Sequence, residues 1–122
     1  MATDKDKLDK VFSLYIRQRD ADSNGLCKCF TCGKVAHWKE MQCGHFQSRK
    51  HLSTRWHLVN CQTQCVGCNI FKYGEQFIFG QNLDLKFGEG TSESLQQMAR
   101  KSKKFMKGEI LELIEHYKSI VK

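Results

Sequence analysis

The sequence lacks any long hydrophobic run. Its longest apolar stretches are short pieces such as Val11-Phe12 and Phe77-Ile78-Phe79. A membrane-spanning helix needs about 20 consecutive apolar residues, so we expect no segment to cross a bilayer. The first ten residues, MATDKDKLDK, are charged and lack the apolar core of a secretory signal. These absences predict a cytoplasmic protein, in a bacterium or in the cytosol of a host cell.

Acidic residues are nearly absent from the middle of the sequence. The 122 residues include 20 Lys and Arg against 13 Asp and Glu, a net charge of +7. Residues 23–74 contain seven basic residues and only one acidic residue, Glu40, whereas the flanking segments are close to neutral. A polyanion is therefore expected to bind to this segment. The alternative is a basic surface that only keeps the protein soluble.

The length fits a single domain, residues 1–122, with a modest hydrophobic core. Residues 4–21 predict an N-terminal helix with one apolar face, formed by Leu8, Val11, Phe12, Tyr15 and Ile16. Residues 26–74 show no helical period until about Cys68 and predict short strands and tight turns, followed by a short helix to Tyr73.

The last third of the sequence, residues 75–122, is predicted to be helical. One helix is expected over 75–87 with an interruption at Gly80, and another over 92–101 with Thr91 as its cap. A third is expected over 108–121, where apolar residues recur on one face.

Two CxxC pairs, Cys29/Cys32 and Cys65/Cys68, predict a metal centre. Two residues between the cysteines allow a tight turn to direct both thiolates at one ion, and two such pairs complete a tetrahedral structural Zn²⁺ site. Disulfides are not expected, because the cytosol is reducing and the number of cysteines, seven, is odd. The remaining three cysteines, Cys27, Cys43 and Cys61, are expected to be small buried or half-buried thiols.

The 32 residues between the two pairs are too many for a plain zinc ribbon. They contain the strings GHF (44–46), SR (48–49) and TRW (54–56), and the second pair lies within NxxxQCxxCN (60–69). In this order, and together with CxxCG (29–33), these strings resemble the HNH, or ββα-metal, nucleases. More narrowly, they resemble the phage NinG-type recombination proteins, from about Cys29 to Tyr117.

The resemblance implies an α+β fold with a small zinc-stapled ββα-metal core that is similar to a treble clef and is flanked by N-terminal and C-terminal helices. It implies that His45 is the general base, that Asn69 binds a catalytic Mg²⁺ or Mn²⁺, and that Asn60 fixes the loop and the orientation of His45. The activity implied is phosphodiester hydrolysis in recombining or branched DNA. Basic residues near these positions are candidates for phosphate binding: Arg49, Lys50, Arg55 and Lys72.

Two positions depart from the pattern of similar sequences. Gly44 stands where many HNH enzymes have a second metal ligand, and His57 stands where an acidic residue is expected. A weakly held Mg²⁺ is compatible with a single amide ligand plus water and DNA oxygens. The alternative function is a non-catalytic zinc module that binds DNA or a recombination protein. A second copy of the chain is a further candidate partner.

Overall fold

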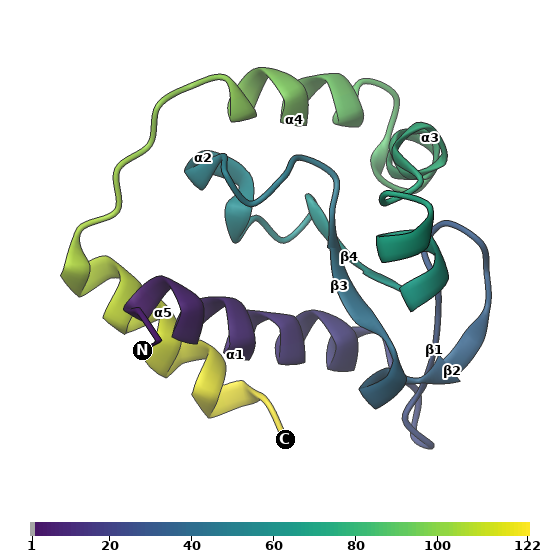
Figure 1. The fold of residues 1–122 in the computed structure, drawn as a ribbon, viewed down its shortest axis with the longest axis horizontal. Coiled ribbons are helices and arrows are strands. Elements are labelled where there is room, and N and C mark those ends of the chain that lie inside the picture. The colour runs from purple at the N-terminus through teal and green to yellow at the C-terminus, as the bar shows by residue number, and fades with distance from the viewer. Residues whose placement is uncertain (1) are drawn as a thin grey trace.

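Helices from the two ends of the sequence pack against each other. The structure is a computed structural model and describes residues 2–122. Helix α1 (Asp4–Arg19) begins at a capping box, in which the Thr3 hydroxyl accepts from the Asp6 amide and the Asp6 carboxylate accepts from the Thr3 amide. Helix α5 (Lys107–Ile120) lies along α1, as Figure 1 shows. Both terminal helices predicted from the sequence are therefore present.

Two antiparallel hairpins lie between these helices in the sequence. Strands β1 (Leu26–Lys28) and β2 (Val35–His37) form the first, and β3 (Gln42–His45) and β4 (Cys61–Gln64) form the second. In the second hairpin His45 lies directly opposite Cys61. The predicted short strands are confirmed, but the same region also contains a 3-10 turn (Trp38–Glu40) and a one-turn helix, α2 (Leu52–Arg55), that were not predicted.

The largest hydrophobic core joins the terminal helices to the second hairpin. Its buried side chains come from α1, α5, the end of α2 and the start of β4: Leu8, Val11, Phe12, Ile16, Trp56, Cys61, Ile110, Ile114 and Tyr117. Cys43 of β3 packs against the same cluster. Because side chains alternate along a strand, Cys43 and His45 share the face of β3 that is turned toward α1, and Gln42 and Gly44 belong to the opposite face.

Helices α3 (Gln76–Phe87) and α4 (Thr91–Ala99) pack against each other, and α4 lies over α2 (Figure 1). The predicted interruption at Gly80 is wrong, because α3 runs through it. A Cβ at Gly80 would lie 3.2 Å from the Phe46 ring, so glycine allows the helix to approach that ring closely. The predicted cap at Thr91 is also wrong: Gly90, with a φ of +92°, precedes the helix, and the Thr91 hydroxyl donates to the Gly88 carbonyl.

The expected short helix after Cys68 is a single wide turn, Gly67–Phe71, closed by a hydrogen bond from the Lys72 amide to the Gly67 carbonyl. The fold is thus α+β, with two small antiparallel sheets and a cysteine cluster beside this turn. None of the helices in residues 2–122 is long and apolar enough to span a membrane.

Candidate metal centre and active-site cavity

Four thiols converge where the first hairpin meets the turn after β4. The sulfurs of Cys29, Cys32, Cys65 and Cys68 all lie within 4.8 Å of one another, and the Cys32 and Cys65 sulfurs are 3.7 Å apart. The turn between the first two cysteines ends at Gly33, whose φ of +80° favours glycine. Four thiolates in this arrangement fit a tetrahedral zinc ion, so the cluster can hold a structural zinc.

The thiols of this cluster differ in their pKa values. Burial would raise the pKa of Cys29, but hydrogen bonds from the Thr31 hydroxyl and from backbone amides outweigh it and lower the pKa to about 6. Burial and the neighbouring thiols raise the pKa of Cys68 to about 12, against the opposing effect of Thr31. Cys29 therefore loses its proton readily, whereas Cys68 loses its proton only when a cation balances the added negative charge.

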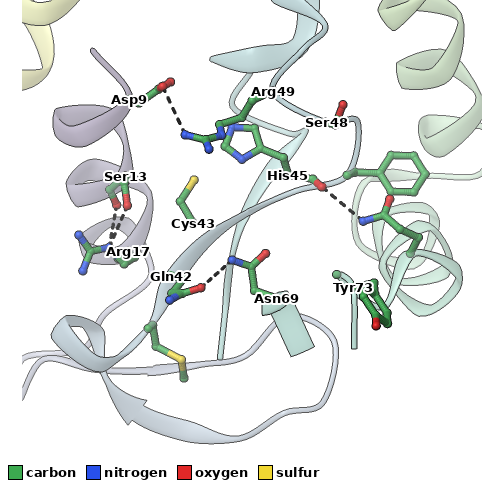
Figure 2. Close-up of a pocket in the computed structure, with 14 residues that line it drawn as sticks. Asp9, Ser13, Arg17, Gln42, Cys43, His45, Ser48, Arg49, Asn69 and Tyr73 are labelled. Carbon is green, nitrogen blue, oxygen red and sulfur yellow. Dashed lines mark hydrogen bonds and ion pairs between the residues drawn. The ribbon is translucent and has the colours of Figure 1, made fainter. Parts of the chain in front are cut away.

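An open cavity of about 860 Å³ lies beside this cluster, between α1 and the edge of β3. Figure 2 shows the side chains that line it: Asp9, Arg17 and other residues of α1 on one side, Cys43, His45 and Arg49 in the middle, and Asn69 and Tyr73 on the other side. The structure thus brings His45 and Asn69 to one cavity, from opposite faces of β3.

His45 is held in one orientation by the backbone. Its Nε2 lies 2.9 Å from the Arg55 carbonyl oxygen, and because a carbonyl only accepts, Nε2 carries the hydrogen. Nδ1 therefore carries the lone pair. Burial lowers the pKa of His45 below its ordinary value, although the Arg55 carbonyl acts in the opposite direction. The ring is thus neutral at neutral pH and able to accept a proton.

The side-chain amide of Asn69 has its nitrogen engaged in a hydrogen bond and its oxygen available. Its side-chain nitrogen donates to the Gln42 side-chain oxygen at 2.7 Å, which leaves the Asn69 oxygen for a ligand (Figure 2). Amide oxygens are suitable ligands for Mg²⁺, which prefers hard oxygen donors. The residues at this position therefore fit a weakly held divalent ion.

The packing of the neighbouring strand leaves no space for a side chain at Gly44. A Cβ at this position would lie 1.9 Å from the side-chain oxygen of Gln64, which is fully buried on the neighbouring strand. Gln64 itself is held by donating to the Gly74 carbonyl and the Thr31 hydroxyl. Residue 44 cannot contribute a second metal ligand while Gln64 occupies this space.

Asn60 is fully buried and fixes the loop after β3. Its side-chain oxygen accepts from the Gln47 amide at 2.7 Å, and its nitrogen donates to the carbonyls of Gln47 and Thr54. The Thr54 carbonyl directly precedes Arg55, whose own carbonyl holds His45. Asn60 thus supports the segment that orients the His45 ring.

The candidate phosphate-binding residues have very different surroundings. Arg55 is largely buried and donates to Asp9 from Nε at 3.0 Å and from a terminal nitrogen, with its guanidinium 5.2 Å above the Trp56 ring. Arg49 also pairs with Asp9, at 3.5 Å, but is 64% exposed. Lys50 and Lys72 are exposed. Arg49 and the two lysines can therefore reach a ligand, whereas Arg55 is engaged within the protein.

Asp9 is the site residue that sequence reasoning missed. Besides both arginines, its carboxylate accepts from the indole nitrogen of Trp56 at 2.9 Å. The partners lie 40 or more residues away in the sequence, so no local pattern identifies them. The sequence offers one signal for Asp9. It lies beside the apolar face of α1, where a charged side chain is partly shielded from solvent.

His57, the other departure from the pattern, closes a turn. Its Nδ1 accepts from the amides of Val59 and Asn60, and it does not line the cavity. The three remaining cysteines are buried or half-buried free thiols, as predicted, and Cys27 donates to the Ala36 carbonyl.

Comparison with known proteins gives one family. The model described as "Bacteriophage Lambda NinG protein" matches residues 3–122, which include every predicted site residue. No curated protein and no solved structure matches the chain.

Proposed function

The chain belongs to the bacteriophage lambda NinG family, and from this premise we propose that it is a metal-dependent DNA endonuclease of the HNH type. We interpret β3, β4 and the turn Gly67–Phe71 as the ββα-metal core, stapled by zinc at the four-cysteine cluster. The substrate we propose is DNA undergoing recombination, including branched DNA.

One observation carries this proposal: His45 and Asn69 open into the same cavity. Phosphodiester hydrolysis needs a base that activates water and a positive charge at the phosphate. A module that only binds DNA needs neither a neutral histidine with an unprotonated nitrogen nor an amide oxygen left for a hard cation. The exposed basic side chains of Arg49, Lys50 and Lys72 support a phosphate ligand.

In this proposal each group has a role. Asn69 would hold Mg²⁺ or Mn²⁺, which when bound neutralises charge on the scissile phosphate. Nδ1 of His45 accepts a proton from water while the water oxygen attacks phosphorus. The bond between phosphorus and the 3′ oxygen breaks, and the 3′ oxygen takes up a proton from solvent. The Nε2 contact with the Arg55 carbonyl keeps the ring in the required tautomer. Arg49 binds a neighbouring phosphate oxygen.

A nicking assay tests the proposal. Supercoiled plasmid and four-way DNA are incubated with the zinc-loaded protein and Mg²⁺ or Mn²⁺. Cleavage is expected for the wild type, and His45→Ala should reduce its rate by about 10²–10⁴-fold with little change in DNA binding. His116→Ala, which removes an exposed histidine of α5 outside the cavity, is the matched control. An equal rate in His45→Ala and wild type would refute the assignment of the base.

Two further variants separate the roles of the asparagines. Asn69→Ala should stop cleavage, and its zinc content must be measured because Cys68 is adjacent. Asn60→Ala should reduce cleavage only partly, since Asn60 orients the site and does not touch the reacting atoms. DNA binding without any metal-dependent cleavage by the wild type would favour the non-catalytic module instead.

A further inference from the structure

We infer that the chain has a second site for a soft metal ion, formed by Cys43, His45 and Cys61. One ligand atom from each of these residues lies within 4.8 Å of the other two. The strand register explains the convergence, because His45 is directly opposite Cys61 and Cys43 precedes His45 by two residues on the same face. No residue of this site belongs to the four-cysteine cluster.

The donor set selects Zn²⁺ over the hard ions. Two thiolates and an imidazole are soft to borderline ligands, which Mg²⁺ and Ca²⁺ avoid. Two thiolates also balance the charge of Zn²⁺ while the imidazole adds none, so the occupied site is neutral. Neutrality matters here because Cys61 is completely buried, and an uncompensated charge at that depth is costly.

The ligands are held by structure that already exists. The Cys61 thiol and the His45 Nε2 both point at the Arg55 carbonyl, at 3.5 and 2.9 Å. Asn60 supports the loop that carries this carbonyl. Nε2 keeps its hydrogen on the Arg55 carbonyl, so the lone pair that a metal would take is on Nδ1. Metal binding requires the loss of one proton from each thiol, both released to solvent, and with its proton the Cys61 thiol also loses its contact with the carbonyl.

The site is accessible from the cavity. Cys43 and His45 both line it, and Figure 2 shows their side chains on the α1 side of β3. Three protein ligands with solvent at the remaining position are the arrangement that open zinc sites use. An ion that enters through the cavity therefore meets Cys43 and His45 first, and the third ligand, Cys61, is completely buried and does not line the cavity.

Occupation of this site has a consequence for His45 that rests on the proposed function. A ring bound to zinc cannot accept a proton from water, so the zinc-bound and cleaving states exclude each other. Zinc in excess of the amount that fills the four-cysteine cluster is then an inhibitor, and Mg²⁺ does not replace it.

Counting metal ions tests the site without reference to activity. The full chain is kept reduced, loaded with excess Zn²⁺, desalted, and weighed by mass spectrometry under native conditions. We expect two zinc ions in the wild type and one in Cys43→Ser. Cys27→Ser is the matched control, because Cys27 is a buried free thiol outside both ligand sets, and it should keep two. Thermal melts establish that the variants are folded.

A single zinc in the wild type, or the same count in Cys43→Ser and wild type, would overturn the proposal. A mass lower by two hydrogens, with one zinc bound, would also overturn it, because Cys43 and Cys61 would then be a disulfide. A second measurement uses Co²⁺, whose thiolate charge-transfer absorption should continue to rise after the first equivalent in the wild type but not in Cys43→Ser.

The inhibition is measured separately. Cleavage by the wild type should fall at least tenfold as Zn²⁺ is added in the presence of Mg²⁺, whereas the rate of Cys43→Ser, compared with its own rate before zinc is added, should fall less than twofold. Equal inhibition of both proteins would refute the link between the second ion and His45. If neither protein cleaves DNA, the proposed function fails, while the metal count still decides whether the second site exists.

Discussion

Replacing Asp9 by Asn tests the connection between α1 and the wall of the cavity. The Asp9 side chain is only 14% exposed, and its carboxylate contacts the side chains of Arg49, Arg55 and Trp56. Asparagine has nearly the same shape, but it carries no charge and has one acceptor oxygen. The variant therefore loses one of the two hydrogen bonds from Arg55 and the attraction to both arginines.

The expected loss of stability follows from these contacts. A hydrogen bond between charged groups contributes about 1.5–3 kcal/mol. The pair with Arg49 adds at most about 1 kcal/mol, because the Arg49 side chain is 64% exposed and screened by water. We expect the free energy of unfolding to fall by about 2–3 kcal/mol. For a chain of this length, each kcal/mol changes Tm by about 4 °C, so Tm should fall by about 10 °C.

Thermal melts followed by circular dichroism measure this change. Glu112→Gln is the control, since it removes the same charge from an exposed residue of α5 that makes no ion pair or side-chain hydrogen bond within residues 2–122. Its Tm should stay within about 2 °C of wild type. If Asp9→Asn melts at the same temperature as the control, the contacts of Asp9 do not support the cavity wall.

Three other predictions concern zinc, salt and pH. Cys65→Ser should lose zinc and the native circular dichroism spectrum together, because the thiolates of a closed site converge only in the folded chain; a normal melt would contradict this. DNA affinity should fall steeply between low and physiological salt, since residues 23–74 carry a net charge of +6. Reversing the exposed charges of Arg100, Lys101, Lys103 and Lys104 tests whether the segment before α5 contributes to DNA affinity. Burial lowers the pKa of His57 from its ordinary 6.5, so the unfolded chain takes up this proton first and stability should decrease as the pH falls below about 6.5. In His57→Asn this part of the decrease should be absent from urea titrations at about pH 7 and pH 5.

The sequence predicts those parts of the fold that depend on local patterns. Helix α1 and helix α5 agree with the predicted ranges within about two residues, because their apolar residues recur on one face. The cysteine cluster was predicted because its spacing is itself the signal. The predicted interruption at Gly80 is wrong for a different reason. In a sequence, a glycine that ends a helix cannot be distinguished from a glycine that allows close packing, and here the packing partner is Phe46.

The candidate site was only partly predictable for a similar reason. His45, Asn60 and Asn69 were identified through a family resemblance, and the structure places two of them at one cavity. The contacts of Asp9 and the convergence of Cys43 with Cys61 depend on which strand residues are paired and on how α1 docks. Both depend on the tertiary structure. The charges of residues 23–74, seven basic and one acidic, do not indicate that a carboxylate of α1 pairs with arginines of this segment.

The packing of α5 on α1 has a consequence for the order in which the protein folds during synthesis. The Gln18 side chain contacts the Lys122 carbonyl, 104 residues further along the chain, whereas the four-cysteine cluster closes within residues 29–68. Contacts between distant segments form late because a long loop must first be closed. The hairpins and the four-cysteine cluster can therefore assemble while α5 is still being translated, and the apolar face of α1 is fully covered only after α5 has been made. The core between α1 and α5 is therefore completed last, whereas the contacts of Asp9 with Arg49, Arg55 and Trp56 do not involve α5.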